Sequence, residues 1–253
     1  MSARTLTVLA VLLFAITVTV RAPARWLVAA APHAAACDSP SGSMWSGGCA
    51  QLRAAGVALA GFSWKLHLLP LLRGHLDVDL KSADPRAPGT ARVSFGVNRR
   101  IVLSDVRADL PVDSGFLPVL PDGWSGQVQL ALEKVEFGAG RLESIQGTAT
   151  ARSLAQRSPA LSFGSYELRF GDAARAAGSA SGAQQAVITG NLRDLGGPMA
   201  VTGTLTIRNG NEYELAGLVA ARPEANAELA KSVEFLGPVD ADGRRPFSLA
   251  GSF

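Results

Sequence analysis

Apolar and polar side chains alternate along most of residues 62–253, and this period of two predicts the strands of a half-buried sheet. The first predicted strands place their apolar residues on one face: Phe62, Trp64, Leu66 and Leu68, then Leu76, Val78 and Leu80, then Ala91, Val93, Phe95 and Val97. The alternation changes phase between Leu103 and Val106, which predicts a β-bulge near Ser104 and Asp105.

Two features near the C-terminus are sharply defined. Residues 199–220 alternate on both sides of Asn209-Gly210-Asn211, whose residue types favour the positive φ angles of a tight hairpin turn. Residues 223–236 predict a helix, because Pro223 suits a first helical turn and Gly237-Pro238 would end it. The apolar stripe of this helix consists of Leu229, Val233 and Leu236.

About ten short strands in succession, with one helix after them, predict a mainly β fold built as an antiparallel meander. Residues 111–125 and 172–186 interrupt the pattern and are predicted to be loops. Each strand has only one apolar face, so the sheet must curl over on itself or be covered. The glycines within strands favour a curled, half-barrel sheet, and a two-sheet sandwich stays open as the alternative.

The N-terminal segment predicts export across a membrane. Residues 5–20 are uncharged and apolar between Arg4 and Arg21, which indicates a transmembrane signal anchor. Ala22-Pro23-Ala24 also fits a signal-peptidase pattern, so cleavage after Ala24 stays open. With either an anchor or a cleaved signal peptide, the rest of the chain would cross the inner membrane. A retained anchor predicts a single-pass inner-membrane protein with its C-terminal domain in the periplasm.

The predicted domain organisation follows from these patterns. Residues 1–25 would form a cytoplasmic stub and the anchor, and residues 26–40, rich in alanine and proline, would form a tether. Residues 41–253 would form the periplasmic β-domain. Cys37 and Cys49 are the two cysteines of the chain, and an even pair in an exported protein predicts a disulfide, with two free thiols as the alternative.

Composition excludes several classes of function. The chain has 24 Lys and Arg against 21 Asp and Glu, and a net charge of +3 without basic runs does not favour a nucleic-acid partner. No nucleophile motif, zinc motif or phosphate-binding glycine loop is present, so the sequence predicts no enzyme, no cofactor and no metal site. His75, Asp77 and Asp79, with His67 nearby, could suggest a metal site, but alternation explains them as a solvated strand face.

Residues at the start of the predicted sheet form a recognisable series. They are Gly42, Trp45 and Gly47, then Leu59, Phe62, Trp64 and Leu66, then Pro70 and Gly74. Their order and spacing resemble the signature of the type II secretion system protein N family, also called general secretion pathway protein N. Ser43 stands where that family usually has threonine, and the likeness continues at Gly237-Pro238 and Leu249-Ala250-Gly251.

The resemblance implies an accessory inner-membrane subunit of the type II secretion machinery, which exports folded proteins across the outer membrane. It implies protein–protein interaction in the periplasm with the inner-membrane platform or the secretin, and no catalytic residues. The alternative is a periplasmic lipid-binding groove protein, because a bent sheet could enclose an apolar groove for a lipid chain. Trp45 and Trp64 could contact a partner subunit, but the pattern favours a core position for Trp64 and a structural role for Trp45.

Overall fold

The computed structural model describes residues 22–25, 28, 35–54, 56–96, 98–117, 120–171 and 187–252. In these ranges, thirteen strands form one antiparallel sheet in which each strand pairs with its neighbours in the chain. The strands are β1 (Ala35–Gly42), β2 (Ser46–Ala54), β3 (Val57–His67), β4 (His75–Ser82), β5 (Gly89–Gly96), β6 (Arg100–Pro111), β7 (Trp124–Gly138), β8 (Arg141–Gln156), β9 (Leu161–Phe170), β10 (Ile188–Asp194), β11 (Met199–Arg208), β12 (Glu212–Ala221) and β13 (Arg245–Ser252). A 3-10 helix, η1 (Leu69–Arg73), joins β3 to β4, and α3 (Ala227–Glu234) lies between β12 and β13.

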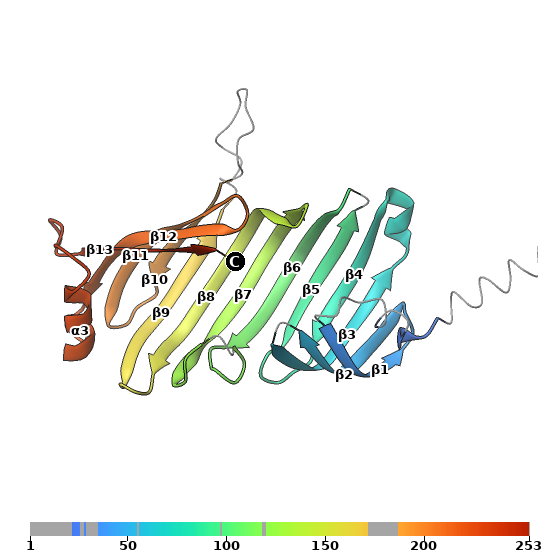
Figure 1. Cartoon of the computed structure of the whole chain (residues 1–253), viewed down its shortest axis with the longest axis horizontal. Helices are drawn as coiled ribbons and strands as arrows, with labels where there is room; N and C mark the ends of the chain where they lie inside the picture. The colour runs from blue at the N-terminus through green and yellow to red at the C-terminus, as the bar shows by residue number, and fades with distance from the viewer. Residues whose placement is uncertain are drawn as a thin grey trace, which may run out of the picture.

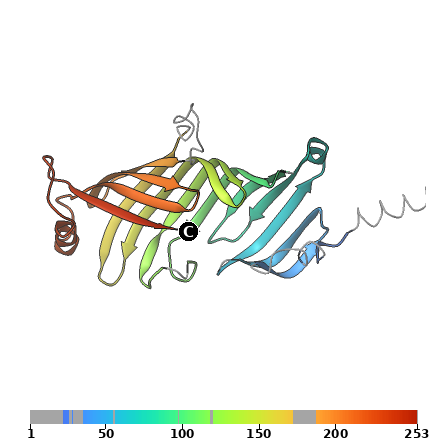
Figure 2. The same ribbon diagram turned by 45° about the horizontal axis from the view of Figure 1, so that its top comes forward.

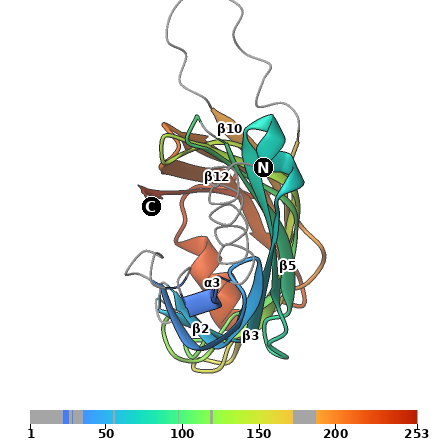
Figure 3. The same cartoon turned by 90° about the vertical axis from the view of Figure 1, so that its right-hand side faces the viewer.

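The sheet is a single curled layer that does not close on itself. Its strands lie side by side in chain order along the length of the molecule (Figure 1), and the tilted view shows the C-terminal strands bending over (Figure 2). Viewed along the sheet, the layer forms an open arch (Figure 3). The mainly β, curled antiparallel fold is therefore confirmed, and the two-sheet sandwich is wrong, because all thirteen strands belong to one hydrogen-bonded ladder.

The concave face carries the apolar side chains in register from strand to strand. Cross-strand partners include Trp64 with Leu80, Val78 with Val93, Leu103 with Val135, Leu168 with Leu192, and Val201 with Val219. Buried residues gather in three clusters, centred on Trp64, on Ile188 and on Val233. The alternation thus places apolar residues on one face, and curling is what buries part of that face.

Curling is strongest in the C-terminal half. The turn between β11 and β12 reaches β8, where the Leu142 N–H donates to the Gly210 carbonyl oxygen at 3.4 Å. Glycine is required at this turn, because φ is +73° and a Cβ would lie 2.8 Å from the backbone of Leu142. Between the paired strands β11 and β12, a Cβ at Gly217 would lie 2.2 Å from the Thr202 carbonyl oxygen. These glycines permit the close backbone approach on which the bend depends.

Several local predictions are confirmed. The bulge lies in β6, where the β5–β6 register shifts between Thr90 and Arg92, and Asp105 has a φ of +52°. The predicted hairpin is β11–β12. The helix is shorter than expected and begins after Asn226, whose side chain accepts a hydrogen bond from the Leu229 N–H at 2.8 Å. Asn226 is the N-cap because its side chain satisfies a free helical donor, which Pro223 cannot do.

Other local predictions are wrong. Strand β1 begins at Ala35, inside the range assigned to the tether. The sequence pattern predicted neither β1 nor β2. Strands β7 and β8 are 15 and 16 residues long, whereas the pattern predicted short strands. Register shifts in the β7–β8 pairing change which face alternate residues occupy, so the alternation is interrupted before the strand ends.

The predicted anchor, residues 5–20, and the predicted loop at 172–186 lie outside the described residues. Within the described part of the chain, no helix is long and apolar enough to cross a bilayer.

Candidate functional site

The first glycines of the signature build the tight turn between β1 and β2. Gly42 pairs with Gly47, and Gly42 has a left-handed φ of +84°. Ser43 closes the turn, since its N–H donates to the Ser46 carbonyl oxygen at 2.9 Å and its Oγ accepts from the Ser46 N–H at 3.1 Å. A Cβ at Gly42 would lie 2.6 Å from the Ser46 carbonyl oxygen, so glycine is a geometric requirement here.

Trp64 lies against this turn and is 7% exposed. Its Nε1–H donates to the Met44 carbonyl oxygen at 3.1 Å. A Cβ at Gly47 would lie 2.7 Å from the indole Cζ2, so Gly47 leaves the space that the ring occupies. Around the ring pack the apolar residues Cys49, Phe62, Leu66, Val78 and Leu80. Trp64 therefore fills the N-terminal core, as the strand pattern indicates.

Trp45 is half-buried in the same turn. Its carbonyl oxygen accepts a hydrogen bond from the Leu66 N–H at 2.7 Å, which ties the turn to the end of β3. This contact agrees with a structural role at the entry to the sheet.

Cys37 and Cys49 are joined by a disulfide between β1 and β2, with Cα atoms 5.5 Å apart. Cys37 lies opposite Leu52 and Cys49 lies opposite Pro40, so the bond crosses the hairpin diagonally. Ser39, between Cys37 and Pro40, has a left-handed φ of +51°.

The last two signature residues shape η1. Pro70 lies in its first turn, where the backbone N–H groups have no acceptor within the helix, so proline loses no hydrogen bond there. Gly74 ends it with a left-handed φ of +79°, and its N–H donates to the Leu71 carbonyl oxygen at 3.0 Å. Pro70 and Gly74 thus fix a short, defined turn between β3 and β4.

This turn exposes a run of leucines, which we call the leucine turn: Leu68, Leu69, Leu71 and Leu72, with exposed fractions of 47%, 81%, 50% and 87%. The sequence pattern assigned Leu68 to the buried strand face, which is wrong because β3 ends at His67. Contiguous exposed leucines mark an interaction site more often than scattered ones. The leucine turn is therefore the candidate interaction surface.

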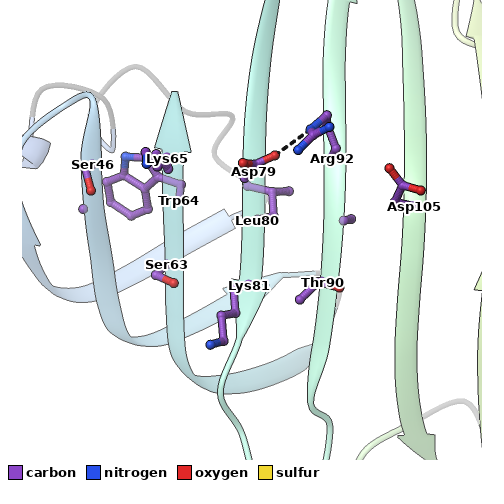
Figure 4. A pocket seen from close by; sticks show the side chains of 12 residues that line it. Ser46, Ser63, Trp64, Lys65, Asp79, Leu80, Lys81, Thr90, Arg92 and Asp105 are labelled. Carbon is purple, nitrogen blue, oxygen red and sulfur yellow. Dashed lines mark hydrogen bonds and ion pairs between the residues drawn. The ribbon is translucent and has the colours of Figure 1, made fainter. Parts of the chain in front are cut away.

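A polar depression of about 470 Å³ extends over β2 to β6, and the charged residues Lys65, Asp79 and Arg92 line it (Figure 4). Asp79 is its central group and accepts from Arg92 Nε at 2.8 Å and from His67 Nε2 at 2.7 Å. The hydrogen bonds from Arg92 and His67 hold the pKa of Asp79 below its ordinary value.

These paired charges fit a solvated strand face better than a reactive site. His75 lies farther from its neighbour, with Nε2 4.0 Å from Asp77 Oδ1. In the ranges that the structure describes, no group of three His, Cys, Asp or Glu residues could hold a metal ion.

Comparison with known proteins assigns the chain to a family. The family model described as type II secretion system (T2SS), protein N, matches residues 34–248, which include the turn at Gly42, the core Trp64 and the leucine turn. The chain belongs to the type II secretion system protein N family. The resemblance seen in the signature residues is thereby confirmed, and membership of this family supports an accessory role in type II secretion.

Two relatives agree with this assignment. The type II secretion system protein N of Vibrio cholerae serotype O1 is 24% identical over 218 residues, covering 83% of this chain and 82% of that protein. The protein of the same name from Aeromonas hydrophila is 24% identical over 228 residues, covering 87% and 85%. No solved structure matches the chain significantly.

The leucine turn is the feature that sequence reasoning missed. Its signal was present, because leucines flank Pro70 on both sides and break the period of two. The pattern marked Pro70 only as the end of a strand, and it could not show that the leucines after it point away from the sheet.

Proposed function

We propose that this chain is an accessory inner-membrane subunit of the type II secretion machinery. Residues 5–20 anchor it, and the curled sheet works in the periplasm by protein–protein contact with the inner-membrane platform or the secretin. Family membership supports the machinery, and the disulfide between Cys37 and Cys49 agrees with an oxidising compartment. The leucine turn is the observation that carries the interaction role, because signature residues hold it and solvent surrounds its apolar side chains.

The packing of residues 22–24 supports an anchor that is retained. The Ala22 carbonyl oxygen accepts from the Met44 N–H at 2.8 Å, and Pro23 bridges to Ser43. Ala24 is 2% exposed and belongs to the Trp64 cluster. Cleavage after Ala24 would remove these contacts from the turn that the signature builds.

We therefore expect the mature protein, isolated from membranes, to keep residues that precede Ala22. Intact-mass measurement and N-terminal sequencing check this directly. A mature chain that begins at Arg25 would contradict the anchored arrangement and would leave the sheet as a secreted domain.

The interaction role predicts the behaviour of a double variant, Leu69→Glu with Leu72→Glu. Both side chains are almost fully exposed, so the substitution should leave the unfolding temperature unchanged. It should lower co-purification with secretion subunits in mild detergent by more than about tenfold, since buried apolar anchors contribute about 2 kcal/mol or more at an interface.

The matched control is Val239→Glu, which places a charge at another exposed apolar position, after α3 and far along the chain. This variant should co-purify with the secretion subunits as well as the unchanged chain does. If the double variant recovers as much of the secretion subunits as the unchanged chain does, the leucine turn is not the contact surface.

A further inference from the structure

A second hollow of about 590 Å³ lies within the C-terminal half of the arch, at the strand ends where α3 packs. Viewed along the sheet, α3 projects inside the arch (Figure 3). Val201 and Val219 form one wall, and Leu229 and Val233 of α3 form another. All lining residues except Ser232 are apolar or aromatic. This cavity shares no residue with the leucine turn or the polar depression.

The two hydroxyl groups that line the cavity donate to backbone carbonyl oxygens. The Tyr166 hydroxyl donates to the Phe163 carbonyl oxygen, and the Ser232 hydroxyl donates to the Glu228 carbonyl oxygen at 2.8 Å. Burial raises the pKa of Tyr166 to about 12, so this hydroxyl stays protonated and keeps donating. Strands β11 and β12 each pair on both sides, which uses their main-chain groups in the ladder.

The walls therefore offer a ligand few hydrogen-bonding groups. An extended peptide would lose its bonds to water, which is costly for each buried amide unless the peptide pairs with the free edge of β13, whose Phe247 lines the cavity. A helix satisfies its own backbone, but it is about 10–12 Å across, so little more than one turn would fill the space. A hydrocarbon chain has no hydrogen-bonding group to satisfy and gains from the burial of each methylene.

The dimensions agree with a single hydrocarbon chain. A methylene takes about the volume of a water molecule, roughly 30 Å³, so 590 Å³ corresponds to about 20 methylenes and a chain of about 16 carbons fits. Trp124 and Phe163 stack with ring centroids 5.1 Å apart and give one wall a rigid aromatic surface. Ser232 and Leu236 are exposed, so the cavity opens to solvent beside α3 and a polar head group could stay outside.

We propose that this cavity binds one acyl chain, with the head group left in water. The binding is a property of the C-terminal half of the sheet and does not depend on the contact at the leucine turn. A free fatty acid and a phospholipid would present the same chain to the cavity, so the experiment must separate these two sources.

The test uses the full chain in its own membranes and hexadecanoic acid with a diazirine in the chain. After illumination, we expect adducts on peptides from β11, β12 and α3. Photoreactive phosphatidylethanolamine with the same chain is used in a parallel sample. Adduct mass tells which source is bound: label from the free acid alone indicates a fatty acid, and label from the lipid indicates a phospholipid.

The decisive variant is Ala151→Trp, which builds a large side chain into the cavity from β8. It should lower labelling of the cavity peptides by at least about tenfold, because the ring excludes the ligand. Ala131→Trp is the control, since Ala131 is an exposed alanine on the neighbouring strand β7, and it should label like the unchanged chain.

Two results would overturn the proposal: labels that avoid the cavity peptides in the unchanged chain, or equal labelling in Ala151→Trp. If Ala151→Trp does not fold, Met199→Trp fills the same cavity from β11 and takes its place. Loss of labelling without loss of co-purification would show that acyl-chain binding and subunit contact are separate properties.

Discussion

Replacing Trp64 by alanine is expected to lower the free energy of unfolding by about 3–5 kcal/mol, the usual cost of removing a large buried aromatic side chain. The ring is 7% exposed and packs among residues from β2, β3 and β4. Its loss would leave a cavity beneath the β1–β2 turn and remove the hydrogen bond to the Met44 carbonyl oxygen. Urea unfolding followed by circular dichroism measures the change.

Trp64→Phe separates the two contributions. Phenylalanine keeps most of the apolar volume but cannot donate, so it should cost only about 1–2 kcal/mol. A loss below about 1 kcal/mol for Trp64→Ala would contradict a core position, because such small effects are typical of surface residues. That result would favour the alternative prediction, in which Trp64 contacts a partner subunit.

The second large effect is expected from the disulfide. Cys37 and Cys49 are separated by 12 residues, and closing a loop of this length constrains the unfolded chain by about 3 kcal/mol. Replacing both cysteines by serine should therefore lower the free energy of unfolding by about that amount. Peptide mass mapping without reductant should recover the two cysteines as one linked pair.

Reductant supplies the control for this prediction. The unchanged chain should lose about 3 kcal/mol when reduced, whereas the double serine variant should not respond. Equal stability of the unchanged chain with and without reductant would mean that the bond is absent from the mature protein. The β1–β2 hairpin would then be held only by its ladder and by the packing of Trp64.

The structure explains why the signature residues occur in this order. Gly42 and Gly47 permit the turn that Trp64 packs against, while Pro70 and Gly74 shape η1. None of them forms the exposed surface itself. Pro70 and Gly74 shape the helix that carries the leucine turn, whereas Gly42, Gly47 and Trp64 shape the neighbouring β1–β2 turn, so the signature describes the support of the proposed contact.

Pattern alone determined most of the strands, because alternation reports directly which side chains share a face. It placed the hairpin at Asn209-Gly210-Asn211 and the bulge at Ser104 and Asp105 through local backbone requirements. It missed β1 and β2, whose residues are mostly small and polar and show little alternation. It also expected short strands where β7 and β8 run for 15 and 16 residues, because the register shifts in their pairing interrupt the alternation.

Only the tertiary structure decided how those strands share their apolar faces. Alternation states that a face is apolar, but a sandwich and a single curled sheet satisfy it equally well. Whether the strands form a sandwich or a single curled sheet depends on which strands pair and on how closely the backbones approach at Gly210 and Gly217. The acyl-chain cavity needs side chains from β8, β11, β12 and α3, which are far apart in the sequence, so no local pattern could reveal it.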